Sequence, residues 1–243
     1  MVDSLEIAKR LVEIKDNGPI YIEFVHNAVV HEPWNAYSSL VFFIPIIYWL
    51  WRLHGIFHLH KIFLILLPLL FLNGLGSTLF HAFRSSPYLL LLDWLPASLM
   101  SFILAGYFWS RILKSWWKSL LMVFGFYVFG FLCTFMLLKV DALASFAQNI
   151  GYFFVGASIL TPIIIVLVKT NFKHLLLVVA SFTFLGLALL CRILDYPTPN
   201  PFPEVLPQGT HFLWHIFSSF AVFTLGYYVF FLNNLYRDKK INP

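Results

Sequence analysis

The chain has 243 residues, of which 60% are hydrophobic and only 11% are charged, with a formal net charge of +5. Soluble domains carry about 25% charged residues, so this composition excludes an ordinary soluble protein and indicates a polytopic membrane protein. The positive charge does not indicate nucleic-acid binding, because membrane proteins keep basic loops that set their topology. Cys133 and Cys191 lie inside apolar runs and predict neither a disulfide nor a zinc knot.

The first 36 residues are too polar to span a bilayer. Residues 3–16 are expected to form an amphipathic helix, with Asp3 and Glu6 as a capping box and an apolar stripe at helical spacing. Asn17-Gly18-Pro19 ends this helix. Residues 1–36 are therefore predicted to lie at the membrane interface.

Seven apolar stretches follow, each near the roughly 20 residues that a bilayer core requires. The expected fold is an all-α membrane protein, a bundle of seven transmembrane helices within residues 37–234, followed by a tail at 235–243. The loop before the last helix contains five prolines between Pro197 and Pro207 and is predicted to be irregular. The helices are predicted at residues 37–53, 61–83, 89–109, 117–138, 145–168, 173–194 and 211–234.

The basic residues predict the orientation of these helices. Ten of the sixteen Lys and Arg residues fall on one side of the membrane, and only Asp238 of the eleven acids does. The positive-inside rule then places the N-terminus outside and the C-terminus in the cytosol. We expect a multi-pass protein of a bacterial inner membrane or of the ER or Golgi, with its outer face in the periplasm or lumen. The ten residues are Arg52, Lys61, Arg111, Lys114, Lys118, Lys169, Lys173, Arg237, Lys239 and Lys240.

Five polar residues fall near the predicted outer ends of three helices. Ser77 and His81 lie in the second helix, and Asp93 lies in the third. His211 and His215 begin the last helix. Within each helical pair the residues are four apart and share a face. Because polar groups are costly in apolar helices and are usually functional, we expect the five to form one site.

His81, His211 and His215 form a candidate metal site. Two histidines four residues apart on one helix can bind a single ion. Three protein ligands with an open fourth position are typical of catalytic zinc. Iron, copper and nickel remain open on ligand type alone.

Other polar residues have simpler interpretations. Ser77 alone fits a small residue that lets two helices approach, and Asp93 alone fits a helix N-cap. Arg192 and Asp195 have the spacing of a local salt bridge, although Asp195 also lies near the expected site. The three histidines at 54, 58 and 60 fit an interfacial cluster better than a second metal site.

These motifs resemble one known family. The patterns Gly-Leu-Gly-Ser-x-x-Phe-His at 74–81, Leu-Leu-Asp-x-Leu-Pro at 91–96 and His-x-x-x-His at 211–215 are similar to those of the alkaline ceramidases. That family belongs to a superfamily of seven-helix membrane hydrolases, which also includes adiponectin-receptor-like proteins and GPI-lipid remodelling proteins. Residues 31–40 are similar to the start of the family's first helix, so the resemblance covers most of the chain.

The resemblance implies a zinc-dependent hydrolase of a membrane lipid amide, with ceramide as the leading substrate. Zinc would be held by His81, His211 and His215. Asp93 would act as general base and then general acid. Ser77 would donate a hydrogen bond to the developing oxyanion.

Eukaryotic members of the family also have an acidic N-terminal cluster that binds calcium. Glu23, Glu32 and Asn27 match parts of this cluster. The run of adjacent acids before the first helix is missing, which argues against calcium regulation of this chain.

Two other functions stay open at this point. The first is a receptor-like protein in which zinc is structural. The second is a hydrolase of another acyl lipid, such as an ester or an N-acyl phospholipid. A transporter fits less well, because it would place charged residues near the membrane midplane of several helices.

Overall fold

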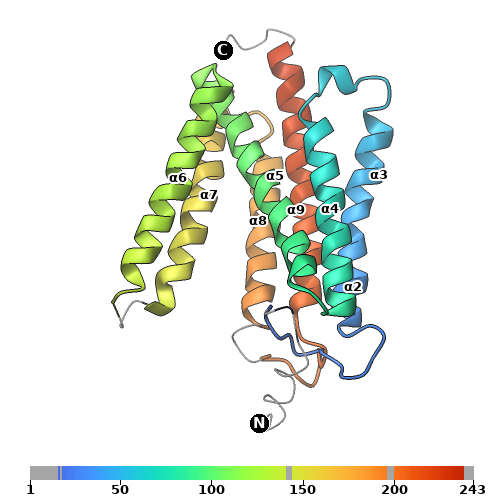
Figure 1. Ribbon diagram of the computed structural model, residues 1–243. Helices are drawn as coiled ribbons and strands as arrows, with labels where there is room; N and C mark the ends of the chain where they lie inside the picture. The colour runs from blue at the N-terminus through green and yellow to red at the C-terminus, as the bar shows by residue number, and fades with distance from the viewer. Residues whose placement is uncertain (1–15, 17, 141–143, 196–199, 238–243) are drawn as a thin grey trace. The chain divides into compact units, whose positions relative to one another are not determined.

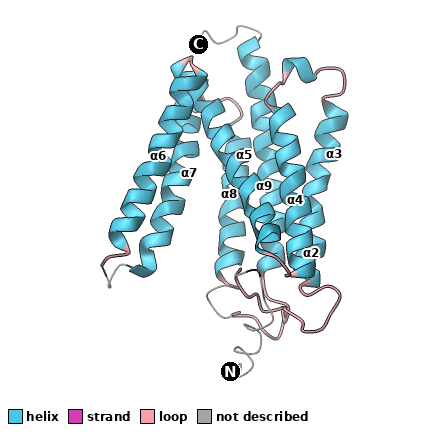
Figure 2. Ribbon diagram, viewed as in Figure 1, coloured by secondary structure: helices cyan, strands magenta, loops and turns pink. Residues whose placement is uncertain are grey.

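A computed structural model of the chain describes residues 16, 18–140, 144–195 and 200–237. This part of the chain is helical and contains no strand (Figure 2). Figure 1 labels the helices, which are α2 (Pro33–Ser39), α3 (Phe43–Arg52), α4 (Phe63–Phe83), α5 (Pro87–Leu113), α6 (Trp116–Leu137), α7 (Ala144–Lys169), α8 (Leu175–Ile193) and α9 (His211–Arg237). The short 3₁₀ segments are η1 (Leu40–Phe42) and η2 (Phe57–Leu59).

The segments α2, η1 and α3 form one continuous helical run. The residues that join them, Leu40 and Phe43, keep right-handed helical backbone angles. The described residues therefore form seven long helices, which confirms the predicted all-α class and helix number. The first run begins at Pro33, four residues earlier than predicted, because proline is well suited to the first helical turn.

Five of the helices, α4, α5, α6, α8 and α9, are long and apolar enough to cross a membrane. Large apolar side chains such as those of Trp51, Phe131 and Leu176 stay exposed on the surface of the protein. A protein keeps so much apolar surface uncovered when lipid covers it. The chain is therefore a multi-pass membrane protein.

Contacts divide the chain into two compact units. The first contains Met1–Ala97 and Leu176–Phe231, and the second contains Ser98–Leu175 and Leu232–Pro243. In the first unit, Trp49 is 2% exposed and packs on Phe63 and Phe230, and a Cβ at Gly226 would lie only 2.8 Å from its ring nitrogen.

The core of the second unit lies between α5, α6 and α7, where α6 and α7 run side by side (Figure 1). Ala105, Trp109 and Val123 are its buried centre. The indole N–H of Trp109 donates to the Ser158 carbonyl at 3.0 Å and ties α5 to α7.

The predictions for the N-terminal segment and for the proline-rich loop are tested to different extents by the structure. Most of the predicted amphipathic helix at 3–16 lies outside the described residues. The proline-rich loop is described from Asn200 onward, where it forms turns and no helix, as predicted. Asn200 closes one turn by donating to the Leu206 carbonyl at 2.6 Å.

Candidate metal centre

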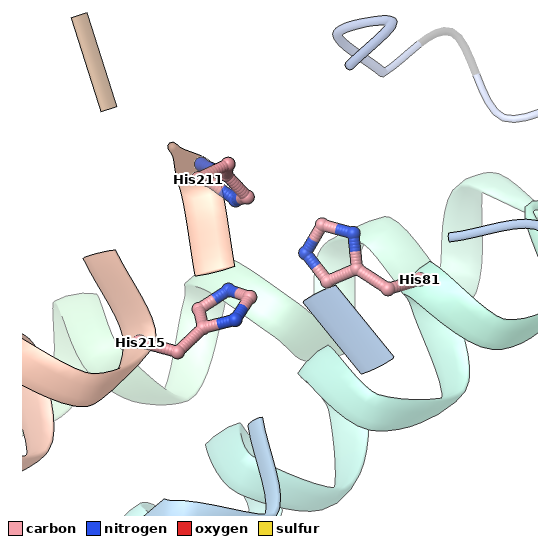
Figure 3. A group of neighbouring side chains, drawn as sticks. All are labelled: His81, His211 and His215. Carbon is pink, nitrogen blue, oxygen red and sulfur yellow. The ribbon is translucent and has the colours of Figure 1, made fainter. Parts of the chain in front are cut away.

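The structure brings the three predicted histidines together inside the first unit. His81 comes from the last turn of α4, while His211 and His215 come from the first two turns of α9 (Figure 3). One ring nitrogen from each lies within 4.8 Å of the others, and all three side chains are buried. The rings face one another, with centroids 4.9–5.2 Å apart.

His81 is held by a buried chain of charged groups. Its Nδ1 lies 2.5 Å from a carboxylate oxygen of Glu32. The other oxygen of Glu32 accepts from Arg84, whose remaining nitrogens donate to both oxygens of Asp16 at 2.8 and 3.0 Å. Because Nδ1–H donates to Glu32, the lone pair of His81 lies on Nε2. This nitrogen faces His211 and His215. A carboxylate behind a histidine in this way is typical of metal-binding histidines.

His215 is oriented by the first helical run. Its Nδ1 lies 2.9 Å from the Ser38 hydroxyl and 3.2 Å from the Ser39 hydroxyl. Both serines donate to the Asn35 carbonyl, so they are able to accept from the imidazole. With the proton of His215 on Nδ1, its lone pair lies on Nε2, which is 3.5 Å from the Ser77 hydroxyl.

His211 is positioned by the residues that begin α9. One oxygen of the Asp195 carboxylate accepts from the backbone N–H groups of Thr210 and His211 at 2.8 and 2.7 Å, so it caps the helix. A Cβ at Gly209, which has a φ of +82°, would lie 2.3 Å from that oxygen. The Tyr21 ring stacks on the His211 ring at 3.8 Å and closes the other face.

Ser77 and Asp93 lie beside the histidines. Ser77 is 1% exposed, and the Asp93 carboxylate interacts with its hydroxyl and with His81. A Cβ at Gly76 would lie 2.3 Å from the Leu92 carbonyl oxygen, so only glycine allows α5 to approach α4 this closely. Pro96 has no N–H for that carbonyl, which keeps it free of the usual helical bond.

The residues present fit a bound metal ion. The His81 Nε2 and the His211 Nδ1 are buried and have no hydrogen-bond partner within the described part of the chain. Buried polar atoms without a partner cost about 1–3 kcal/mol each, and a metal ion would satisfy both. Neutral imidazoles suit zinc, and also iron, copper or nickel.

Glu23 and Asp195 have roles in the structure that differ from those expected from the sequence. The two oxygens of Glu23 accept from the N–H groups of Trp34 and Asn35 at the start of α2, so this carboxylate caps a helix. Burial raises the pKa of Glu23 to about 8, against the lowering effect of these hydrogen bonds. The expected salt bridge between Arg192 and Asp195 is replaced by the helix cap described above, and Arg192 lies over the Trp214 ring at 5.9 Å.

The histidines near the other end of the first unit do not form a metal group. His54 and His58 are exposed, whereas His60 is 1% exposed and stacks on Phe230. Among the described residues, only the His81, His211 and His215 set brings three candidate ligands together.

Sequence reasoning missed five residues that contact the site, namely Asp16, Tyr21, Ser38, Ser39 and Arg84. Arg84 is 2% exposed and adopts a left-handed conformation with a φ of 45°. Asp16 ends the segment predicted as an amphipathic helix, and Tyr21 lies in the polar stretch after it. No pattern in either segment predicts contact with the histidines. The one available signal was that Arg84 follows His81 by three residues.

The sequence matches no protein-family model, and a comparison with characterised proteins finds no significant match.

Proposed function

We propose that this protein is a zinc-dependent hydrolase of a membrane lipid amide, with ceramide as the leading substrate. The observation that carries the proposal is the buried set of three histidines with Ser77 and Asp93 beside it. A carboxylate beside the ligands can act as a general base, and a hydroxyl can donate to an oxyanion. A purely structural zinc site needs neither role. The sequence resemblance to alkaline ceramidases supports the same reaction.

The chain's own residues can supply the proton transfers of this reaction. Zinc held by the three histidines would act as a Lewis acid that activates water and polarises the amide carbonyl. Asp93 accepts the proton of the attacking water as the C–O bond forms, and delivers it to the leaving nitrogen as the C–N bond breaks. Ser77 donates a hydrogen bond to the oxyanion, a contribution of about 3 kcal/mol for comparable donors.

The proposed substrate reaches the site from the bilayer. The exposed apolar side chains of α4 and α5 provide a surface that acyl chains can follow, among them Leu72, Tyr88 and Leu91. The distribution of basic residues supports a position of this site on the periplasmic or lumenal side. We propose a bacterial inner membrane or the ER or Golgi as its location.

The proposal is tested with purified protein and a panel of lipids, each assayed with and without chelator. Ceramides of several chain lengths, an N-acyl phospholipid and an ester-linked lipid are compared, and mass spectrometry identifies the released acid and base. Preferential cleavage of ceramide is expected. Preference for another lipid would make that lipid the proposed substrate. Cleavage of none would favour a receptor-like protein with a structural zinc.

Histidine variants test the metal site directly. Alanine at His81, His211 or His215 is expected to remove both the bound zinc and the lipid hydrolysis. His54→Ala is the matched control, because His54 is exposed and lies away from the site. Full hydrolysis by a zinc-free preparation would contradict the proposal.

Asp93→Asn separates metal binding from proton transfer. The variant is expected to keep its zinc and to lose turnover by about 10²–10⁴-fold, the usual contribution of a general acid–base group. Zinc content and product release are measured on the same sample. Normal turnover with normal zinc would remove Asp93 from the mechanism.

A further inference from the structure

A second polar site lies in the unit that contains α6 and α7. A cavity of about 430 Å³ is lined there by Ser110, Arg111, Lys114, Ser115, Trp116 and Tyr236. All six residues belong to this one unit. The lining has two cations and two serine hydroxyls but no carboxylate.

We propose that this cavity binds a phosphate-bearing anion such as the headgroup of an acidic phospholipid. The proposal is independent of the proposed hydrolase function.

Arg111 supplies a positive charge that its protein neighbours leave unbalanced. One of its terminal nitrogens donates to the Asn233 side-chain oxygen at 2.6 Å. Its guanidinium lies over the rings of Tyr107 and Tyr236, at 4.6 and 5.0 Å. Its Nε is buried and has no hydrogen-bond partner among the described residues. These neighbours are all neutral, so an anion would supply the missing partner of a partly buried cation.

Lys114 adds a second charge from a strained backbone position. Its φ is 53°, and its N–H donates to the Ser110 carbonyl at 3.0 Å to close the last turn of α5. Glycine is the residue that adopts this conformation without strain. Strain of this kind is often found at functional positions, and here it holds a lysine at the edge of the cavity.

The start of α6 completes the site. Ser115 is its N-cap and accepts from the Lys118 N–H at 3.4 Å, and Trp116 is its first residue. The N–H groups of the first helical turn carry partial positive charge, which favours an anion. The cavity therefore combines a guanidinium, an ammonium, two hydroxyls and a helix N-terminus.

The surroundings favour a lipid as the source of the phosphate. Trp116 and Trp117 are 48% and 70% exposed, as expected for aromatic residues at a membrane interface. Basic pockets between membrane helices bind acidic headgroups in this setting. Free inorganic phosphate has the same chemistry, so the experiment must separate the two.

Native mass spectrometry of the full chain in a neutral detergent measures the site. Phosphatidylglycerol and phosphatidylcholine are titrated in parallel, and inorganic phosphate is then added as a competitor. We expect phosphatidylglycerol to bind in preference to phosphatidylcholine. Displacement by millimolar phosphate would identify a general phosphate site, and resistance to phosphate would identify a lipid headgroup site. Either result supports an anion site, whereas equal binding of the two lipids overturns it.

Two lysine variants show whether the cavity is the place where phosphatidylglycerol binds. Lys114→Gln is expected to weaken phosphatidylglycerol binding by about tenfold, since it removes one charge-assisted hydrogen bond. Lys118→Gln is the matched control, because Lys118 is exposed at the same end of α6 but does not line the cavity. Its binding should stay within about twofold of the unmodified protein. Equal losses in the two variants would show attraction by surface charge alone and would overturn the proposal.

Discussion

Glu32 determines which nitrogen of His81 is available for a ligand. Its carboxylate lies 2.5 Å from Nδ1 and is itself 0% exposed, so the proton of the neutral imidazole is held on that nitrogen. Arg84 balances the charge of Glu32, and Asp16 holds Arg84 in place from the other side. A single buried network therefore fixes both the orientation and the tautomer of one predicted metal ligand.

Glu32→Gln is expected to weaken zinc binding without removing any ligand. Loss of the carboxylate behind a metal-binding histidine typically costs 10–100-fold in affinity, and about that loss is expected here. The measurement is a zinc titration against a competing chelator. Glu204→Gln is the control, because Glu204 is an exposed carboxylate in the loop before α9. Unchanged affinity in Glu32→Gln would show that the network is not coupled to the metal.

Glu23 is expected to make the stability of the protein depend on pH. Burial raises its pKa to about 8, compared with about 4.3 in an unfolded chain. Between these values the folded state holds a proton that the unfolded state has lost, so the free energy of unfolding falls as the pH rises. Above the pKa of the folded state, the contribution of Glu23 to the free energy of unfolding is lost, and that free energy no longer changes with pH on account of Glu23.

Glu23→Gln is expected to flatten this pH dependence, because glutamine does not titrate. Thermal unfolding of both proteins is followed from about pH 5 to about pH 8. The difference between their melting temperatures should change steadily across that range. A constant difference would mean that Glu23 has an ordinary pKa in the folded protein.

At the scale of helices, the position of Asp93 depends on how closely α5 approaches α4. Gly76 on α4 faces the Leu92 carbonyl. The Asn73 side chain donates to the carbonyl of Asp93 itself. These two contacts place the start of α5 against the end of α4, where Ser77 and His81 lie.

Gly76→Ala is therefore expected to impair turnover more than metal binding. The new Cβ would meet backbone at 2.3 Å, so α5 must shift and carry Asp93 away from Ser77. Overpacking of this kind costs about 1–3 kcal/mol of stability. Gly186→Ala on α8 is the matched control, because a Cβ there meets nothing within 4 Å. Product release, zinc content and melting temperature are measured for both, and equal behaviour would show that the close approach is unimportant.

At the scale of the whole molecule, membrane topology decides which compartment the histidine site faces. The excess of basic residues at one set of helix ends predicts a cytosolic C-terminus. A phosphatase reporter fused after the last residue should be inactive, and a fluorescent reporter there should fluoresce. The opposite pair of results would place the histidine site on the cytosolic side.

The periodic and compositional features of the chain could be predicted well from sequence. Apolar length alone located seven helices, because a bilayer imposes nearly the same length on each one. Helical spacing put His211 and His215 on one face. The alternating direction of successive helices predicted that His81 lies at the same end of the bundle as His211 and His215, and the three side chains do lie together.

The partners of these residues could not be predicted in the same way. Asp16, Tyr21 and Glu32 come from an irregular N-terminal stretch, and Asp195 reaches His211 from the end of another helix. No repeat describes such loops, because their paths depend on contacts between residues far apart in the chain.

The sequence by itself determined the membrane class, the helix number and the three candidate ligands. Only the tertiary structure decided that Glu32, Ser38 and Asp195 hold those ligands, and that Arg84 balances the charge of Glu32. The physical reason is that bilayer thickness and helical periodicity act locally on any apolar segment. Hydrogen bonds between distant buried groups exist only once the chain has packed.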